Sequence, residues 1–406
     1  MKIFFALIPL LLLAGCTSSI DPMEPPNELA TIGKPELEVS HLWVRQQGKG
    51  SAGKQLKLTV HVDGERVFSA NHAGRVEAIS REDGNELWRN ELKAAINSGP
   101  GDGGDLLLLG GNAEVIALQK KDGSISWRTP VSSEVLSIPQ RKGNIVVVHS
   151  VDGNITALDA TSGKRLWQHR ESVPALSLRG SSDPYLLDTA VLIGTANGKV
   201  IALSLDDGRV LWETVVAEPR GRTEVERVVD VDAELAVGNG VVHAASYQES
   251  LVTLSLESGQ LLWSRDIGSS SGMVIDGAYL YVSDVNGDLW ALSRRDGETM
   301  WKQDALHRRG LSAPVQQGNY LIVGDFEGYL HWVDKEDGHL VGRSRVRNLL
   351  EYWPVDDVLD DAYTDYYEED RSVHLAPAVE GRQVFGLDKR GVLDAYRVSP
   401  VAAETE

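Results

Sequence analysis

The sequence predicts an all-β fold, an eight-bladed β-propeller built from four-stranded antiparallel blades. Three observations lead to it: a unit that repeats about every 40 residues, strand-like alternation within each unit, and complementary half-units at the two ends of the chain. The clearest copy of the unit spans residues 153–167. It reads Gly, any residue, an aliphatic residue, any residue, Ala-Leu, a polar turn that ends in Gly, and then Leu-Trp.

The unit occurs eight times. Its Ala-Leu step, or a related pair, begins at Ala78, Ala117, Ala157, Ala202, Thr253, Ala291, Trp332 and Ala395. The tryptophan of the repeat is found at Trp43, Trp88, Trp127, Trp167, Trp212, Trp263 and Trp301. Because seven of the ten tryptophans occupy one repeat position, we expect them to fill the space between neighbouring blades rather than to bind a ligand. In the seventh copy this part of the unit degenerates to Val341-Gly342.

Each repeat predicts about four strands. Apolar and polar residues alternate in each half of the unit, which is the two-residue period of a half-buried strand. Asp-Gly or Ser-Gly between two such runs indicates a hairpin, because glycine accepts the positive φ that the turn needs. A further apolar run with its own turn precedes each unit, as residues 146–148 precede Asp152-Gly153. Radial packing of four-stranded sheets is typical of a propeller.

The two ends of the chain predict how the ring closes. The eighth copy, residues 391–396, has no Leu-Trp strand after it, and Leu42-Trp43 has no first half before it. We therefore expect the N-terminal strand to complete the last blade and to cover edges that would otherwise invite aggregation. The propeller is predicted to span residues 36–400 as a single domain.

Composition excludes several classes of function. The 406 residues carry a formal net charge of −19, which argues against a nucleic-acid partner and against simple adhesion to anionic lipid. The single cysteine leaves no intrachain disulfide and no cysteine-based metal cluster.

The N-terminus reads as a targeting segment. Residues 1–15 have the short apolar run of a signal peptide and lead into Leu-Ala-Gly-Cys at residues 13–16. This sequence resembles the lipobox of bacterial lipoproteins, and the resemblance implies lipidation of Cys16. Thr17 stands where aspartate usually retains such proteins in the inner membrane, so the resemblance implies an outer-membrane anchor with the body in the periplasm. Residues 16–35 are polar and Pro-rich and predict a flexible tether.

Insertions into the repeat are the candidate binding loops. The first, within residues 168–185, carries Leu176, Leu178 and Arg179. Two leucines and an arginine on a loop suit a protein interface, since apolar anchors and arginine are enriched there. The alternative is that the leucines tuck into their own blade.

The second insertion lies in the next blade, hence beside the first, and carries Asp230 and Asp232. These carboxylates could pair with Arg179 or with basic groups of a partner. Paired carboxylates can also serve acid–base catalysis or calcium binding, but no third and fourth oxygen ligands recur at loop spacing. A third insertion, residues 344–372, is acidic, with Tyr363, Tyr366 and Tyr367 among its carboxylates. It is either a solvated loop or a contact surface.

Motifs of catalysis and cofactor binding are missing. Residues 284–288, Asp-Val-Asn-Gly-Asp, resemble a calcium loop but match plain hairpin turns in other copies. The glycine-rich residues 99–104 lack the Gly-Lys-Ser/Thr of a phosphate loop, and the ten histidines form no pair at ligand spacing. We predict no catalytic residue, no metal and no cofactor.

Residues 157–167 closely resemble the repeat of the quinoprotein dehydrogenases, eight-bladed propellers that carry pyrroloquinoline quinone. That resemblance makes an enzyme the alternative function. Such enzymes are usually longer, many have a vicinal cysteine pair, and they need a calcium site and a catalytic aspartate, none of which this sequence offers.

The repeat, the lipobox and the length together resemble the BamB family, propeller lipoproteins of the machinery that assembles outer-membrane β-barrels. The resemblance covers essentially the whole chain and includes the motifs at residues 176–179 and 230–232. It implies a non-enzymatic scaffold in which Leu176, Leu178, Arg179, Asp230 and Asp232 bind the POTRA domains of the barrel subunit BamA. Contact with unfolded outer-membrane proteins, and a sugar-binding propeller as a third option, stay open at this point.

Overall fold

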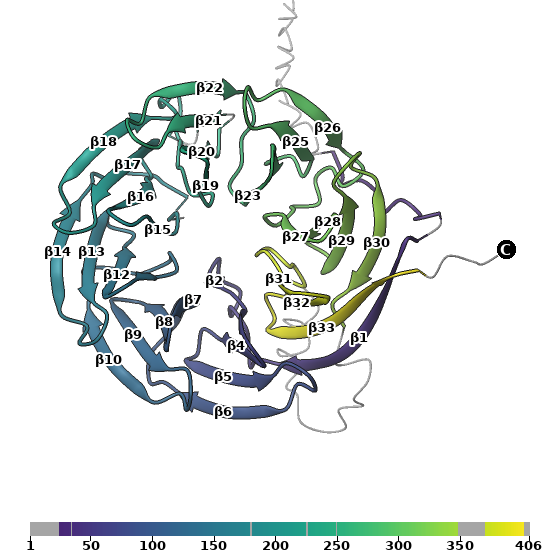
Figure 1. Ribbon diagram of the computed structural model, residues 1–406, viewed down its shortest axis with the longest axis horizontal. Coiled ribbons are helices and arrows are strands. Elements are labelled where there is room, and N and C mark those ends of the chain that lie inside the picture. The colour runs from purple at the N-terminus through teal and green to yellow at the C-terminus, as the bar shows by residue number, and fades with distance from the viewer. Residues whose placement is uncertain are drawn as a thin grey trace, which may run out of the picture.

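The computed structural model describes residues 24–33, 35–178, 181–224, 226–248, 250–347 and 370–401. These residues form strands, turns and connections without a helix, so none of them forms a helix that could cross a membrane. Eight sheets stand around a central axis like the blades of a fan (Figure 1). The predicted eight-bladed propeller is confirmed.

Each of the first four blades begins near the axis and ends at the rim. Their strands are, in chain order, β3 (His61–Asp63), β4 (Arg66–Ala70), β5 (Arg75–Ser80) and β6 (Glu86–Glu91); β7 (Ile96–Gly103), β8 (Leu106–Gly111), β9 (Glu114–Gln119) and β10 (Ile125–Pro130); β11 (Gln140–Lys142), β12 (Ile145–His149), β13 (Asn154–Asp159) and β14 (Arg165–Arg170); β15 (Tyr185–Leu186), β16 (Ala190–Gly194), β17 (Lys199–Ser204) and β18 (Val210–Val215).

The remaining four blades repeat this order. They consist of β19 (Ala236–Gly238), β20 (Val241–Ser246), β21 (Ser250–Ser255) and β22 (Leu261–Arg265); β23 (Gly272–Asp276), β24 (Tyr279–Ser283), β25 (Leu289–Ser293) and β26 (Thr299–Gln303); β27 (Val315–Gln317), β28 (Tyr320–Gly324), β29 (Tyr329–Asp334) and β30 (Leu340–Arg345); β31 (Ala378–Glu380), β32 (Gln383–Leu387), β33 (Val392–Pro400) and β1 (Leu37–Gln46).

The N-terminal strand closes the ring, as predicted. β1 pairs antiparallel with β33, from Leu37 opposite Pro400 to Gln46 opposite Val392. The first and the last strand of the chain therefore share one blade, and Figure 1 shows them together at the lower right. Closure joins residues that lie at opposite ends of the sequence.

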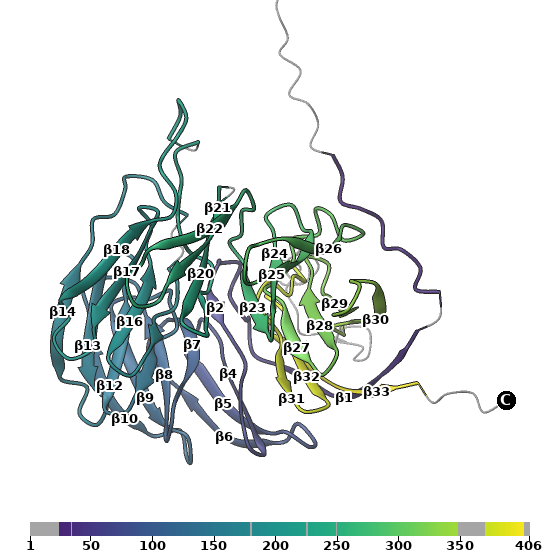
Figure 2. The ribbon, with the colours of Figure 1, turned by 45° about the horizontal axis from the view of Figure 1, so that its top comes forward.

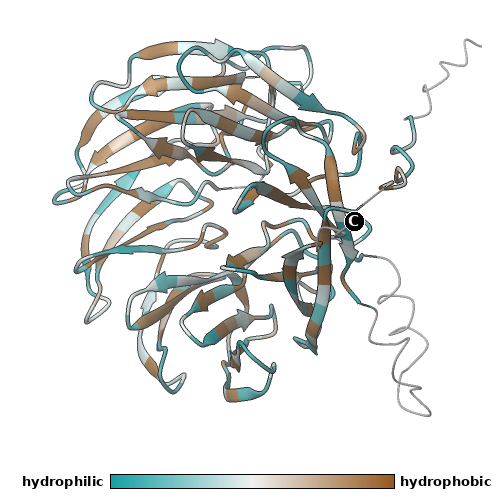
Figure 3. Cartoon of the chain, turned by 45° about the vertical axis from the view of Figure 1, so that its right-hand side comes forward, coloured by the Kyte–Doolittle hydropathy of each residue, from teal (hydrophilic) through white to brown (hydrophobic). Residues whose placement is uncertain are grey.

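The strands are apolar where they meet other blades. The two middle strands of a blade are almost wholly buried, as in β8. In the outermost strands, exposed residues alternate with buried or half-buried ones, as in β10. In Figure 3, which is coloured by hydropathy, apolar residues are concentrated in the strands and hydrophilic ones in the turns. The core is thus a series of apolar layers between neighbouring blades.

The repeated tryptophans fill the space between blades, which confirms their predicted role. Each indole N–H donates a hydrogen bond of 2.8 to 3.1 Å to a backbone carbonyl of the following blade. Each ring lies against the turn glycine between the third and fourth strands of that blade, where φ is between 68° and 82°. At Gly208, for example, an added Cβ would come within 2.5 Å of the Trp167 ring. Glycine is required there by both its φ and its neighbour.

The seventh blade lacks the tryptophan for a geometric reason. Gly342 stands opposite Trp332 in the ladder, at the position that Trp167 takes opposite Ala157. The next blade is the one closed by β1, so its third and fourth strands are not joined by a turn. A tryptophan here would have no turn glycine to lie against, and Leu37 of β1 lies beside Gly342 instead.

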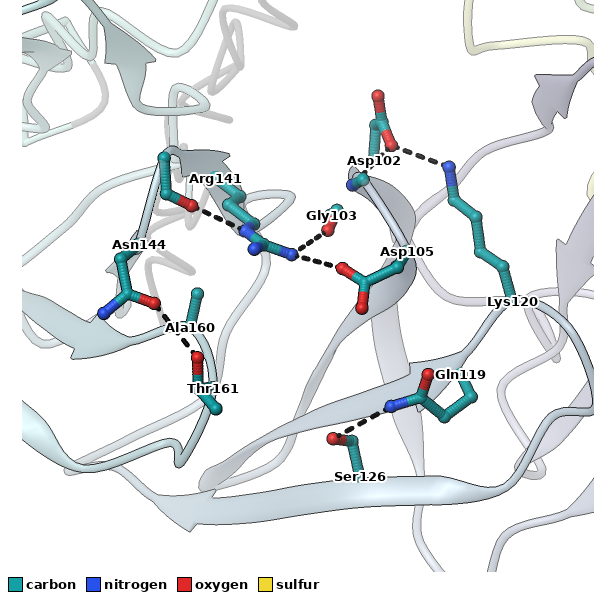
Figure 4. Close-up of polar contacts among 12 residues, drawn as sticks. Asp102, Gly103, Asp105, Gln119, Lys120, Ser126, Arg141, Asn144, Ala160 and Thr161 are labelled. Carbon is teal, nitrogen blue, oxygen red and sulfur yellow. Dashed lines mark hydrogen bonds and ion pairs between the residues drawn. The ribbon is translucent and has the colours of Figure 1, made fainter.

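Polar contacts also join neighbouring blades (Figure 4). Arg141 of β11 lies 2.7 Å from a carboxylate oxygen of Asp105 in the second blade. The Lys120 ammonium lies 2.7 Å from Asp102 and 2.9 Å from Asp63 of the first blade. Together with the tryptophans, these contacts hold neighbouring blades together.

One additional strand was not predicted. β2 (Lys57–Leu58) pairs parallel with β7 and makes the second sheet five-stranded. It belongs to residues 47–59, which leave β1 at the rim and return to the axis before β3 begins. This segment brings Leu56 and Lys57 to the centre of the propeller.

The predicted tether is described only in part. Residues 24–33 lie outside the ring beside β26 and β30 and hydrogen-bond to the propeller (Figures 1 and 2). The signal peptide, Cys16 and most of the acidic insertion, residues 348–369, lie outside the described residues. At the end of that insertion Asp370 pairs with Lys389 at 3.1 Å.

Candidate functional site: a docking surface on the connection face

The strand order of the blades gives the disc two distinct faces. Each blade is an antiparallel meander, so the turn between its second and third strands lies on the same side as the connection to the next blade. We call this side the connection face, and the opposite side, which carries the turns at Gly163 and Gly208, the turn face. Both candidate binding insertions link successive blades and therefore lie on the connection face.

The first insertion exposes its leucines. Leu176 and Leu178 are 41% and 44% exposed, so they do not tuck into their own blade. The backbone N–H of Leu178 donates a 3.0 Å hydrogen bond to Oδ1 of Asp230. This bond joins the two insertions and confirms that they lie side by side. Arg179, the third predicted residue of this loop, lies outside the described residues.

The two aspartates lie beneath this loop. Asp230 is fully buried and Asp232 is 8% exposed, so neither carboxylate faces outward in the described structure. Among the described residues, Oδ2 of Asp230 has no hydrogen-bond partner. The sequence allows these carboxylates to pair with Arg179 or with a partner's basic groups, whereas the side-chain contact that the structure shows for Asp230 is the amide of Leu178. Asp230 thus fixes the position of the leucine loop from below.

Burial perturbs both carboxyls. Desolvation raises the pKa of Asp230 to about 6, although the Leu178 amide opposes the change. Desolvation, together with the nearby Asp230 carboxylate, raises the pKa of Asp232 to about 7, against the opposing charge of Lys57. Near neutral pH the pair therefore holds less negative charge than two exposed aspartates would.

A cavity of about 880 Å³ opens at the centre of the connection face. Leu178 and Asp232 belong to its wall, so the loop that carries Leu176 and Leu178 borders the cavity. We call it the docking loop after its candidate role. Lys57 enters from β2 and donates hydrogen bonds to the Ser181 carbonyl at 2.9 Å and to Asp183 at 3.1 Å. Lys57 and Asp183 are not predictable as cavity residues from the sequence, because no local pattern shows that residues 47–59 return to the axis.

The cavity wall offers few aromatic faces on which a flat quinone could stack. Tyr247 is the one Phe, Tyr or Trp side chain among the described residues that line the cavity. The possible calcium loop at residues 284–288 is the turn between β24 and β25, as predicted. There Oδ1 of Asp284 accepts the amides of Asn286 and Asp288, and Oδ2 accepts the Trp290 indole N–H.

The buried aspartates predict a pH dependence of stability. The folded pKa of Asp232, about 7, exceeds its ordinary value of 3.8, so the folded state binds this proton more tightly than the unfolded state. The free energy of unfolding should then fall as pH rises from about 4 to about 7. Asp232→Asn mimics the neutral form and is expected to raise that free energy by about 1–3 kcal/mol at pH 8 and to leave it unchanged at pH 4.

Urea unfolding at both pH values would measure this effect. Asp206→Asn, in the exposed turn of the fourth blade, is the matched control. An equal gain for Asp232→Asn at pH 4 and pH 8 would contradict the assignment of the effect to a buried carboxylate.

Comparison with known proteins gives the family. A family model described as outer membrane protein assembly factor BamB matches residues 72–303. The protein of that name from Alkalilimnicola ehrlichii is 42% identical over 341 residues, which cover 84% of this chain and 88% of the relative. The Escherichia coli protein of that name is 34% identical over 353 residues, which cover 84% and 90%.

Solved structures agree with this result. The crystal structure of BamB from Moraxella catarrhalis superposes with a TM-score of 0.76 at 24% identity, and the match covers 89% of this chain and all of that one. The quinohemoprotein alcohol dehydrogenase of Comamonas testosteroni has a TM-score of 0.67 at 13% identity over 92% of this chain and 78% of the enzyme, a likeness that shows the fold alone. The chain belongs to the family of the outer membrane protein assembly factor BamB.

Proposed function

We propose that this protein is a lipid-anchored, non-enzymatic scaffold of the outer-membrane β-barrel assembly machinery. Its relatives are named as outer membrane protein assembly factors, which supports a role in that process. The lipobox at residues 13–16 supports an anchor at Cys16 in the outer membrane, with the propeller in the periplasm. A scaffold of this kind acts by holding a partner in a fixed orientation on a stiff disc.

The proposed partner is the row of periplasmic POTRA domains of BamA. Leu176 and Leu178 would bury their apolar side chains against a POTRA domain, and Arg179 would add a charged contact beside them. Asp230 would act on the interface through the loop that it holds, and Asp232 through its place at the border of the cavity. The observation that carries this assignment is the pair of exposed leucines fixed by a buried carboxylate, because a preorganised apolar loop loses little entropy on binding.

Replacing both leucines tests the docking surface. Leu176→Asp/Leu178→Asp is expected to weaken binding to purified POTRA domains by about 100-fold or more, since apolar anchors at the centre of an interface each contribute on the order of 2 kcal/mol. Binding would be measured by calorimetry on a chain that lacks the signal peptide and Cys16, here called the soluble chain. Arg179→Glu should also weaken binding while leaving the β-sheet circular dichroism unchanged.

The control is Leu87→Asp. Leu87 is 52% exposed on β6, at the rim of the first blade and away from the docking loop. Leu87→Asp introduces the same chemical change elsewhere on the propeller and should leave the affinity for the POTRA domains unchanged. Equal affinity of the double variant and the wild type would refute the docking surface, and loss of the folded spectrum in Arg179→Glu would refute an interface role for that arginine.

A further inference from the structure

Residues 24–33, here called the strap, are held by the connection between the sixth and seventh blades. The Asn27 backbone N–H donates a 3.1 Å hydrogen bond to the His307 carbonyl, and its side-chain amide donates one of 3.0 Å to the Asp304 carbonyl. In return, Nη1 of Arg309 donates to the Asn27 carbonyl at 3.1 Å. Three hydrogen bonds at a single residue fix this point of the chain to the propeller.

Further contacts extend the docking in both directions along the strap. Arg308 donates a 2.8 Å hydrogen bond to the Glu24 carbonyl, and Arg343 of β30 donates one of 3.1 Å to the Ala30 carbonyl. Leu29 packs against the apolar cluster between the sixth and seventh blades. The strap therefore follows a continuous path of backbone and apolar contacts, which chance adhesion of a polar tether would not produce.

The propeller presents Arg309 to the strap in a fixed orientation. Its side chain is 3% exposed and its Nε lies 2.8 Å from the fully buried carboxylate of Asp325, which His331 also contacts at 2.9 Å. The Glu327 carboxylate accepts a hydrogen bond from a second guanidinium nitrogen of Arg309, Nη2. The remaining nitrogen, Nη1, is the one that bonds to the strap. Contacts within the propeller therefore hold the Arg309 side chain in place where the strap binds.

The path of the strap runs from one face of the disc to the other. β1 is the outermost strand of its blade and begins on the turn face, where the amide of Glu36 bonds to the Val341 carbonyl. Residues 304–309, which hold Asn27, form the connection from β26 to β27 and lie on the connection face. Followed toward its N-terminus, the strap therefore leaves the turn face, passes β30 and reaches the connection face (Figure 2).

We propose that the strap routes the membrane anchor to the connection face, so that the sixth and seventh blades face the lipid surface with the docking loop on the same side of the disc. This inference rests on the lipid anchor at Cys16 proposed above. Glu24 follows Cys16 by eight positions, so the anchor lies within about 29 Å of the strap's docking site. If the strap were not docked, the first fixed residue would be Leu37, which follows Cys16 by 21 positions. The anchor could then lie up to about 75 Å from the turn face.

The proposal predicts which face of one blade lies nearer the membrane. Val285 is in the connection-face turn of the sixth blade and 40% exposed, and Arg295 is in its turn-face turn. Val285→Cys and Arg295→Cys would each carry a fluorophore on the lipidated full-length chain, where Cys16 is already acylated. The chains would be placed in phosphatidylethanolamine–phosphatidylglycerol vesicles that contain a headgroup-labelled quencher lipid.

Quenching at position 285 is expected to exceed that at position 295 by about twofold or more, because a strand length of roughly 20 Å separates the two turns. Asn27→Ala/Leu29→Asp removes strap contacts without changing the propeller, and should abolish the difference. Glu28→Ala, an exposed strap residue, is the matched control and should preserve it. Equal quenching at the two positions in the wild type, or a difference that persists in the double variant, would overturn the proposal.

Two further readouts separate this proposal from the proposed function. Failure of the wild-type chain to float with vesicles would refute the anchor and the strap's role together. POTRA binding by the soluble chain should be the same for the wild type and the strap variant. If the quenching difference appears while POTRA binding is absent, the strap's role is supported and the proposed partner is refuted.

Discussion

Trp167→Ala is expected to lower the free energy of unfolding by about 3–5 kcal/mol, the range for deleting a buried aromatic side chain. Trp167 is 8% exposed and lies between the third and fourth blades. Its ring lies against Gly208, and its indole N–H donates a 2.8 Å hydrogen bond to the Leu205 carbonyl. Removal leaves a cavity that two paired sheets cannot close without breaking strand pairing. Urea unfolding followed by the fluorescence of the remaining tryptophans measures the change.

Trp167→Phe separates packing from hydrogen bonding. Phenylalanine keeps an aromatic ring against Gly208 but lacks the indole N–H. We therefore expect the free energy of unfolding to fall by about 1–2 kcal/mol. Gly342→Ala is the second comparison, because Gly342 holds the tryptophan position in the seventh blade and an added Cβ there meets Leu37 at an ordinary 3.6 Å. The free energy of unfolding of Gly342→Ala should remain close to that of the wild type. A loss for Gly342→Ala as large as that for Trp167→Ala would show that the seventh interface depends on its repeat position after all.

Removal of the closing strand is expected to have a still larger effect. A chain that begins at Gln47 lacks β1 and therefore exposes the edge of β33 along its whole length. It also loses Trp43, which is 7% exposed and packs against the turn of Gly84 in the first blade. We expect this chain to lose the soluble monomer and to aggregate through the open edge. Size-exclusion chromatography of refolded protein measures the monomer fraction.

A shorter truncation provides the control. A chain that begins at Pro35 lacks the strap and keeps β1, so it should remain a folded monomer. Adding a synthetic peptide of residues 35–46 to the longer truncation should restore a monomeric complex, since the peptide supplies the missing strand. A soluble, cooperatively folding monomer without residues 35–46 would refute the closure.

The repeat was predictable because its determinants are local. Hairpin turns need glycine at positive φ, blades need alternating apolar residues, and both requirements recur within one unit of sequence. The incomplete units at the two ends predicted the pairing of β1 with β33, since each lacks what the other supplies. The loss of tryptophan at Gly342 was visible in the sequence as well, but its cause became clear only with the missing turn in the last blade.

Sequence by itself determined the class of fold, the number of blades, the closing strand and the two insertions that meet on one face. Tertiary structure decided what their side chains do: Asp230 is buried beneath Leu178, 52 residues away in the chain. It likewise brought Lys57 to the axis and Arg309 to a strap 282 residues away. The physical reason is range, because periodicity and turn chemistry act between near neighbours in the sequence. Burial and ion pairing depend on segments that become neighbours only when the ring closes.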